Sequence, residues 1–168
     1  MRAKLKELIP YVIIVVVVIL LRTFIITPVE VVGESMENTL KDNELLFLNK
    51  ISYKVGELKR FDIVVLTNHN EELIKRIIAL PGEHIEYRDN ILYINHEEVT
   101  DDYSDDITND FSIEDLGYDV IPLGKYFVLG DNRDNSADSR VIGLIDKKDI
   151  SGTVSFRFWP LNKIGIVK

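Results

Sequence analysis

The sequence predicts a mainly β protein, in which an antiparallel β-sheet domain follows one N-terminal transmembrane helix. Three observations favour this fold class. Residues 8–27 form a long apolar run, the rest of the chain alternates short apolar segments with turn-forming residues, and 46% of the 168 residues are hydrophobic, which is enough to bury one domain core. We therefore expect a short N-terminus (residues 1–7), a membrane anchor (residues 8–27) and one folded domain (residues 28–168).

The apolar run fits a membrane-spanning helix. About 20 helical residues span about 30 Å, the thickness of the hydrocarbon core of a bilayer, and Arg22 near the end of the run can extend its guanidinium to the interface. Arg2, Lys4 and Lys6 precede the run, and because basic residues stay in the cytoplasm, they place the N-terminus inside and residues 28–168 outside. A cleaved secretory signal is disfavoured because no Ala-x-Ala-like triplet follows the run. A buried helix is a weaker alternative, because the run is apolar on every face.

Alternating apolar residues and turn residues predict the strands of the domain. Pro28 has no backbone N–H and is expected to end the helix, with an extended segment at residues 29–32 after it. Asp89-Asn90 separates two short apolar segments, 85–87 and 91–93, and so predicts a hairpin. The predicted strands lie at residues 45–48, 63–67, 73–80, 91–95, 125–129 and 153–159. Their short connections indicate an antiparallel sheet.

The charge balance excludes several classes of function. The net charge is −8 and no basic stripe follows the anchor, so we expect no nucleic-acid partner. The chain has no cysteine, which excludes disulfides, thiolate nucleophiles and cysteine-type zinc sites. Residues 97–119, the acidic segment, contain ten acidic residues and no Lys or Arg, a composition typical of a solvated surface insert. A Ca²⁺ site there is a weaker alternative, because the spacing lacks the glycine and the terminal glutamate of an EF-hand loop.

Ser35 is the strongest candidate for a nucleophile. Gly33, two residues before it, allows a tight backbone turn, so that the serine hydroxyl and the serine N–H can both face a substrate. Ser35 also follows Ile26, the last apolar residue of the run, by nine residues. This spacing places the candidate nucleophile close to a membrane surface.

A serine nucleophile needs a base. His69, His84 and His96 lie in turns or at strand ends, which are usually solvated, so a histidine base is disfavoured. Lys75 lies inside a predicted strand with apolar residues on both faces. If its ammonium is buried, its pKa falls and the neutral amine can accept the serine proton; the alternative is that the side chain extends to water.

A polar loop is predicted after the strand at residues 125–129. Residues 130–140 read Gly-Asp-Asn-Arg-Asp-Asn-Ser-Ala-Asp-Ser-Arg. By itself this composition is typical of Asx turns with local salt bridges.

Taken together, these stretches resemble type I signal peptidases, membrane-anchored Ser–Lys proteases that remove signal peptides from exported proteins. Four segments carry the resemblance, in the order and spacing of the family: Ser35-Met36-x-x-Thr39-Leu40 is similar to its nucleophile box, Asp62-Ile63-Val64-Val65 to its second box, Lys75-Arg76-x-Ile78-x-Leu80-Pro81-Gly82 to its lysine box, and residues 130–140 to its final box. The single anchor and the small domain are similar to those of Gram-positive members.

The resemblance implies roles for nine residues. Ser35 would be the nucleophile and Lys75 the general base. The supporting residues would be Ser136, which hydrogen-bonds to the lysine amine, and Asp138 and Arg140, which brace the loop. A shallow pocket for small side chains would be lined by Val31, Gly33, Met36 and Ile74.

The resemblance also implies the partners and the location of the chain. The substrates would be the signal peptides of preproteins, cut after Ala-x-Ala-like sites without a metal or an organic cofactor. The chain would lie in the bacterial cytoplasmic membrane as a single-pass protein, in contact with the lipid bilayer and near the secretion translocon. Three positions depart from the family pattern: Asn38 stands where a proline is usual, and Phe61 and Ala79 stand where glycines are usual.

Two rival functions share part of this pattern. A self-cleaving Ser–Lys protease of the LexA type shares the serine turn and a later lysine, but this chain has an apolar run at its N-terminus and no Ala-Gly dipeptide. A non-catalytic, membrane-anchored β adaptor domain would not need the serine, the lysine and the polar loop together.

Overall fold

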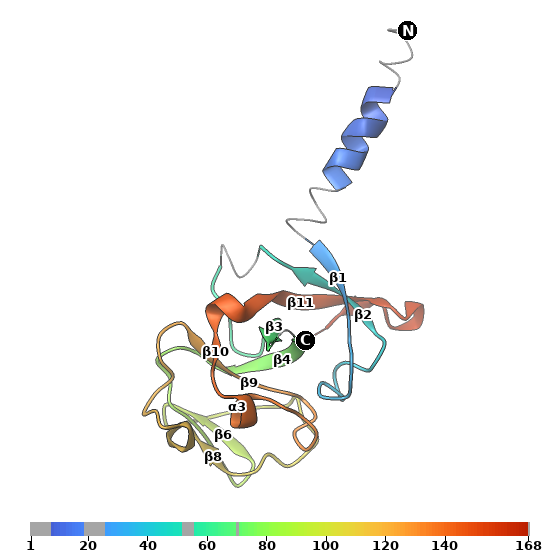
Figure 1. The fold of residues 1–168 in the computed structure, drawn as a ribbon. Helices are drawn as coiled ribbons and strands as arrows, with labels where there is room; N and C mark the ends of the chain where they lie inside the picture. The colour runs from blue at the N-terminus through green and yellow to red at the C-terminus, as the bar shows by residue number, and fades with distance from the viewer. Residues whose placement is uncertain (1–7, 19–25, 52–55, 70, 168) are drawn as a thin grey trace.

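The computed structural model describes residues 8–18, 26–51, 56–69 and 71–167, and Figure 1 shows the fold. Residues 8–18 are helical, and their large apolar side chains are exposed. Within the described ranges, no helix has the length and apolar character needed to cross a membrane. The predicted anchor also includes residues 19–25, and the predicted cytoplasmic N-terminus consists of residues 1–7; both stretches lie outside the described residues.

The prediction of a helix up to residue 27 is wrong at its end, because strand β1 (Ile26–Glu30) begins there. β1 pairs antiparallel with β2 (Leu45–Asn49), and Pro28 lies opposite Phe47. β1 is the edge strand of its sheet, where a proline is tolerated because an outward N–H would have no partner strand. Pro28 therefore lies inside a strand and does not mark the end of a helix.

The domain is built on an eight-stranded antiparallel sheet with the order β1-β2-β11-β3-β4-β9-β10, in which β12 also pairs with β11. The other strands of this sheet are β3 (Ile63–Asn68), β4 (Glu71–Ala79), β9 (Lys125–Leu129), β10 (Ile145–Asp146), β11 (Ile150–Trp159) and β12 (Gly165–Ile166). All the strands predicted in this part of the chain are confirmed. β4 and β11 begin earlier than predicted, and the two-residue strands β10 and β12 were not predicted because they are too short to show a period.

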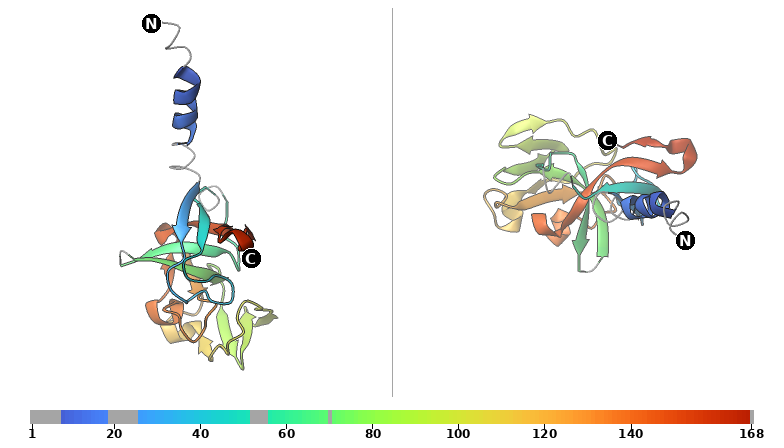
Figure 2. Two further views of the ribbon diagram at one scale, coloured as in Figure 1. Left: turned by 90° about the vertical axis from the view of Figure 1, so that its right-hand side faces the viewer. Right: turned by 90° about the horizontal axis from the view of Figure 1, so that it is seen from above.

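A second, four-stranded sheet has the order β7-β6-β5-β8. Its strands are β5 (Ile85–Arg88), β6 (Ile91–Ile94), β7 (Glu97–Val99) and β8 (Phe111–Ser112). The predicted hairpin joins β5 to β6, and Asp89 and Asn90 both have positive φ, at 52° and 65°, as a two-residue hairpin turn requires. Figure 2 shows this sheet on the opposite side of the domain from β1 and β2. The short helices are η1 (Ile113–Leu116), α3 (Ser139–Ile142), η2 (Lys147–Asp149) and η3 (Leu161–Lys163).

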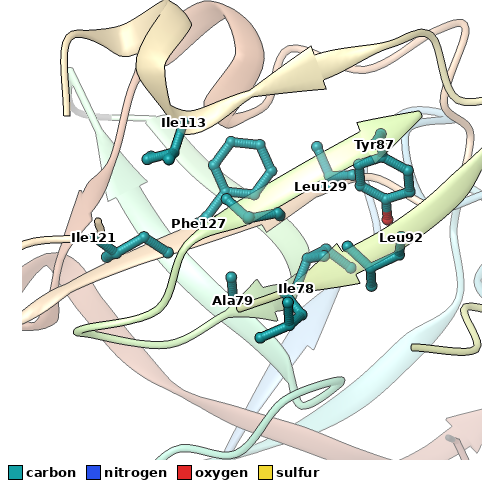
Figure 3. Close-up of a cluster of buried hydrophobic side chains, with 10 residues drawn as sticks. Ile78, Ala79, Tyr87, Leu92, Ile113, Ile121, Phe127 and Leu129 are labelled. Carbon is teal, nitrogen blue, oxygen red and sulfur yellow. The ribbon is translucent and has the colours of Figure 1, made fainter. Parts of the chain in front are cut away.

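The hydrophobic core holds β4 from several sides. Figure 3 shows the cluster in which Ile78 and Ala79 of β4 and Phe127 of β9 pack against the small sheet. Ile74 of β4 contacts a second cluster, which contains Met36, and other β4 residues join a third. Each fully buried large apolar side chain contributes about 1.5–3 kcal/mol to folding, so β4 is one of the most firmly held strands of the domain.

Candidate active site

Ser35 lies in a turn between β1 and β2 that is fixed by backbone hydrogen bonds and by buried side chains. Val31 donates its N–H to the Glu44 carbonyl at 2.8 Å, and its carbonyl accepts from the Asn43 N–H at 2.9 Å. Met36 is 1% exposed and packs in the cluster beneath the turn. Gly33 has a φ of 88°, a conformation that favours glycine, and this supports the predicted tight turn.

Lys75 lies in the middle of β4, opposite Val64 of β3. Its side chain is buried, and its Nζ lies 2.6 Å from the Ser35 Oγ as a hydrogen-bond donor. Burial lowers the pKa of Lys75 to about 8, although the nearby carboxylates of Asp138 and Asp131 act in the opposite direction. The alternative in which this lysine extends to water is therefore wrong.

The loop of residues 130–140 lies directly against the Ser35 turn. Asn132 donates its backbone N–H to the Ser35 carbonyl at 3.1 Å and its side-chain amide to the Glu34 carbonyl, also at 3.1 Å. A Cβ at Gly130 would overlap both the Ser35 carbonyl oxygen and the Ser136 Oγ, so only glycine fits there. The tertiary fold thus brings the first and last boxes of the sequence into contact.

Asp138 and Arg140 hold this loop together, whereas Ser136 does not make its expected contact. Asp138 is fully buried, caps helix α3, accepts the Gly130 N–H at 3.2 Å and binds Arg140 through two bonds of 2.9 Å. The expected hydrogen bond from Ser136 to Lys75 is absent, because among the described residues the buried Ser136 Oγ has no hydrogen-bond partner. Its hydroxyl instead lies beside Gly130.

A groove of about 240 Å³ opens beside Ser35. Of the four predicted pocket residues, Val31, Met36 and Ile74 line it. The prediction for Gly33 is wrong: it is not part of the lining, because its N–H is turned to the Asp42 carboxylate at 2.8 Å and it has no side chain. The other lining residues are Val29, Glu30, Val32, Val65, Glu72 and Leu73.

A buried ion pair next to Lys75 was missed by sequence reasoning. Arg76 and Asp131 are fully buried and form two hydrogen bonds of 2.8 and 2.6 Å. The Thr39 hydroxyl donates to the same carboxylate at 2.5 Å. The sequence contained a signal, since Arg76 and Asp131 both lie in segments that resemble family boxes, but their pairing depends on the sheet register.

The histidines lie elsewhere. His84 is half-buried, not solvated as expected, and its ring contacts the Glu114 carboxylate at 3.0 Å and the ring of His96. No hydrogen bond joins His69, His84 or His96 to Ser35 or Lys75 among the described residues. Lys75 is the only side-chain base in hydrogen-bond contact with Ser35 within the described part of the chain.

Comparisons with known proteins identify the family of this chain. The family described as signal peptidase, peptidase S26, matches residues 5–159. The chain is 42% identical to signal peptidase IB of Staphylococcus aureus, in an alignment that covers 94% of this chain and 93% of that protein. It is 41% identical to signal peptidase I of Bacillus caldolyticus, with 92% and 91% covered. A crystal structure of a signal peptidase I from Enterococcus faecalis is similar at a TM-score of 0.55 and 36% identity, covering 59% of this chain and 97% of that one.

Proposed function

We propose that Ser35 is the nucleophile and Lys75 the general base of this chain, which belongs to the signal peptidase family, peptidase S26. The chain is a serine endopeptidase that removes signal peptides. The observation that carries this assignment is the 2.6 Å contact between the Lys75 Nζ and the Ser35 Oγ at a buried site. Burial favours the neutral amine, which is the form that can accept a proton.

The proposed reaction proceeds through an acyl-enzyme. Neutral Lys75 takes the hydroxyl proton of Ser35 while the Ser35 Oγ attacks the scissile carbonyl carbon, giving a tetrahedral oxyanion and a protonated lysine. Protonated Lys75 then returns the proton to the leaving amine, and the C–N bond breaks. Lys75 then takes a proton from water, which attacks the ester carbonyl. The C–Oγ bond breaks, Lys75 returns the proton to the Ser35 Oγ, and the signal peptide leaves with a free carboxylate.

The backbone N–H of Ser35 is the proposed donor to the oxyanion. Among the described residues, no group accepts a hydrogen bond from this N–H, so it can bind a substrate oxygen. The N–H of Gly33 is already bonded to Asp42 and is not a second donor. Asp138 and Arg140 support the site by holding the loop, and Ser136 supports it by filling the space beside Gly130.

The groove fits an extended peptide with small side chains. Its walls come from residues 29–32, which form the end of β1 and the two positions after it, and from residues 72–74 of β4. In the described sheet, β1 pairs only with β2, and the first half of β4 pairs only with β3, so both strands have an edge that can hydrogen-bond to a peptide backbone. Val31, Met36 and Ile74 leave a shallow apolar cup, which supports cleavage after Ala-x-Ala-like sites.

We further propose a single-pass location in the bacterial cytoplasmic membrane. The apolar run that begins at residue 8 and ends before β1 would be the anchor, with residues 1–7 in the cytoplasm and the domain from β1 onward outside, next to the lipid bilayer and the translocon that delivers preproteins. The basic residues before the apolar run support this orientation. The exposed apolar side chains of residues 8–18 support a location in the lipid bilayer.

Incubation of the full chain in detergent with a preprotein that carries an Ala-x-Ala site tests the assignment. We expect mass spectrometry to show one cut after the second alanine, and we expect Ser35→Ala and Lys75→Arg to abolish it, because a guanidinium stays protonated at any usable pH. A folded Ser35→Ala or Lys75→Arg variant that cleaves at the wild-type rate would refute the dyad.

A further inference from the structure

Part of the acidic segment, residues 101–108, is bonded to a buried arginine of the active-site loop. Arg133 is 4% exposed. Its guanidinium donates to the Asp101 carboxylate at 2.7 Å and to the Thr108 hydroxyl at 2.6 Å, and its backbone N–H donates to the Asp106 carboxylate at 3.0 Å. One short segment thus makes three separate contacts with Arg133. The prediction that residues 97–119 form a solvated surface insert is therefore wrong for residues 101–108.

The same segment covers a second buried arginine. The centroid of the Tyr103 ring lies 3.7 Å from the central carbon of the Arg76 guanidinium and 4.9 Å from the centroid of the Phe61 ring. Arg76 also donates to the Phe61 carbonyl at 2.9 Å. Phe61 has a φ of 68°, a left-handed conformation that favours glycine, and its ring packs against that of Tyr103.

Both arginines hold the loop on either side of Asn132. Asp131 precedes Asn132 and binds Arg76. Arg133 follows Asn132 and donates its Nε–H to the Gly130 carbonyl at 3.0 Å. Asn132 is the residue whose N–H binds the Ser35 carbonyl. Residues 101–108 are therefore linked to Ser35 through only two steps of hydrogen bonding.

We propose that residues 101–108 are a positioning segment for the Ser35–Lys75 pair, an inference that rests on the proposed function. A buried arginine that loses a partner is left with an unpaired donor, and the loop that carries it shifts to regain one. Such a shift moves Asn132, and with it the Ser35 carbonyl. Because a misplacement of about 1 Å can lower a catalytic rate about 100-fold, the chemical step is sensitive to this link.

The expected kinetic signature is a change in kcat without a change in KM. None of the residues that line the substrate groove belongs to the segment, so substrate binding does not depend on it. A loss of overall folding would instead lower the amount of active enzyme and the cooperativity of unfolding.

The test uses three variants of the full chain. Thr108→Val keeps the shape of a 2% exposed side chain but removes its hydroxyl, and Thr108→Ser restores a hydroxyl. Asp102→Asn, on an exposed residue of the same segment, is the matched control. We expect Thr108→Val to lower kcat about tenfold with KM within about twofold, Thr108→Ser to recover most of this loss, and Asp102→Asn to match the wild type.

Hydrogen exchange measured by mass spectrometry on the same samples gives a second readout. Faster exchange at residues 130–136 in Thr108→Val, with unchanged exchange in β11, supports a local shift of the loop. Should Thr108→Val unfold, Asp101→Asn replaces it, since it keeps the side-chain shape while weakening the bond to Arg133. Wild-type kcat together with wild-type exchange in these variants would overturn the positioning role while leaving the dyad intact, whereas a wild-type chain that cleaves nothing would overturn the proposed function itself.

Discussion

Raising the pH from 6 to 9 should increase kcat/KM through a single acid limb centred near pH 8. Lys75 has an ordinary pKa of 10.5 that burial lowers to about 8. With a pKa of about 8, about one Lys75 side chain in ten is neutral at pH 7, whereas a lysine with the ordinary pKa would be neutral in about three molecules in ten thousand. Burial therefore raises the fraction of neutral, reactive Lys75 about 300-fold. The rate should increase nearly tenfold from pH 6 to 7, about fivefold from pH 7 to 8 and about twofold from pH 8 to 9, where it becomes nearly constant.

The same burial predicts a cost in stability. The difference between 10.5 and 8 corresponds to about 3 kcal/mol, and because Lys75 is only 2% exposed, little of this is screened by water. Below pH 8 both the folded and unfolded chains carry the charge, so the folded state bears the full penalty. Between pH 8 and 10.5 the unfolded chain binds the extra proton, and stability should therefore rise with pH across this window.

Lys75→Met separates the two effects. The variant should be inactive, and below pH 8 it should unfold several degrees above the wild type, a difference that shrinks as the pH approaches 10. Steady-state cleavage of a fluorogenic Ala-x-Ala peptide, with Ser35→Ala as the background, gives the pH profile, and thermal unfolding of the same samples gives the stability. An acid limb above pH 10, or a Lys75→Met enzyme less stable than the wild type at pH 6, would refute the assignment of a buried, destabilised lysine.

Three further predictions concern the loop, the groove and the topology. Gly130→Ala should lower kcat/KM at least about 100-fold, because its Cβ would overlap the Ser35 carbonyl and Ser136; near-normal cleavage by a folded variant would show that the loop can move aside. Ile74→Ala should enlarge the groove and raise kcat/KM about tenfold for peptides in which valine replaces one alanine of the cleavage site. If the ratio of kcat/KM between the alanine and valine peptides stays at the wild-type value, this side chain lies outside the specificity pocket. Protease treatment of intact protoplasts should digest the chain beyond Pro28, and protection until lysis would contradict the proposed orientation.

The local features of this chain were readable because they depend on neighbouring residues. The alternation of apolar residues and the turn at Asp89-Asn90 predicted the hairpin, and the same reasoning located the longer strands of both sheets. Gly33 and Ser35 indicated a tight turn, and the positive φ of Gly33 supports it. Pro28 was misread, because a proline that ends a helix and a proline in an edge strand look the same in sequence.

What the sequence by itself determined was the longer strands, the tight turn at Ser35 and the candidate residues for chemistry. What only the tertiary structure decided was which residues meet across long separations. The contact between Ser35 and Lys75 joins residues 40 positions apart, and the Arg133–Thr108 bond links the loop to a segment whose composition is that of solvated surface. Burial is a property of the whole packed sheet, so the lowered pKa of Lys75 follows from its surroundings and not from its neighbours along the chain.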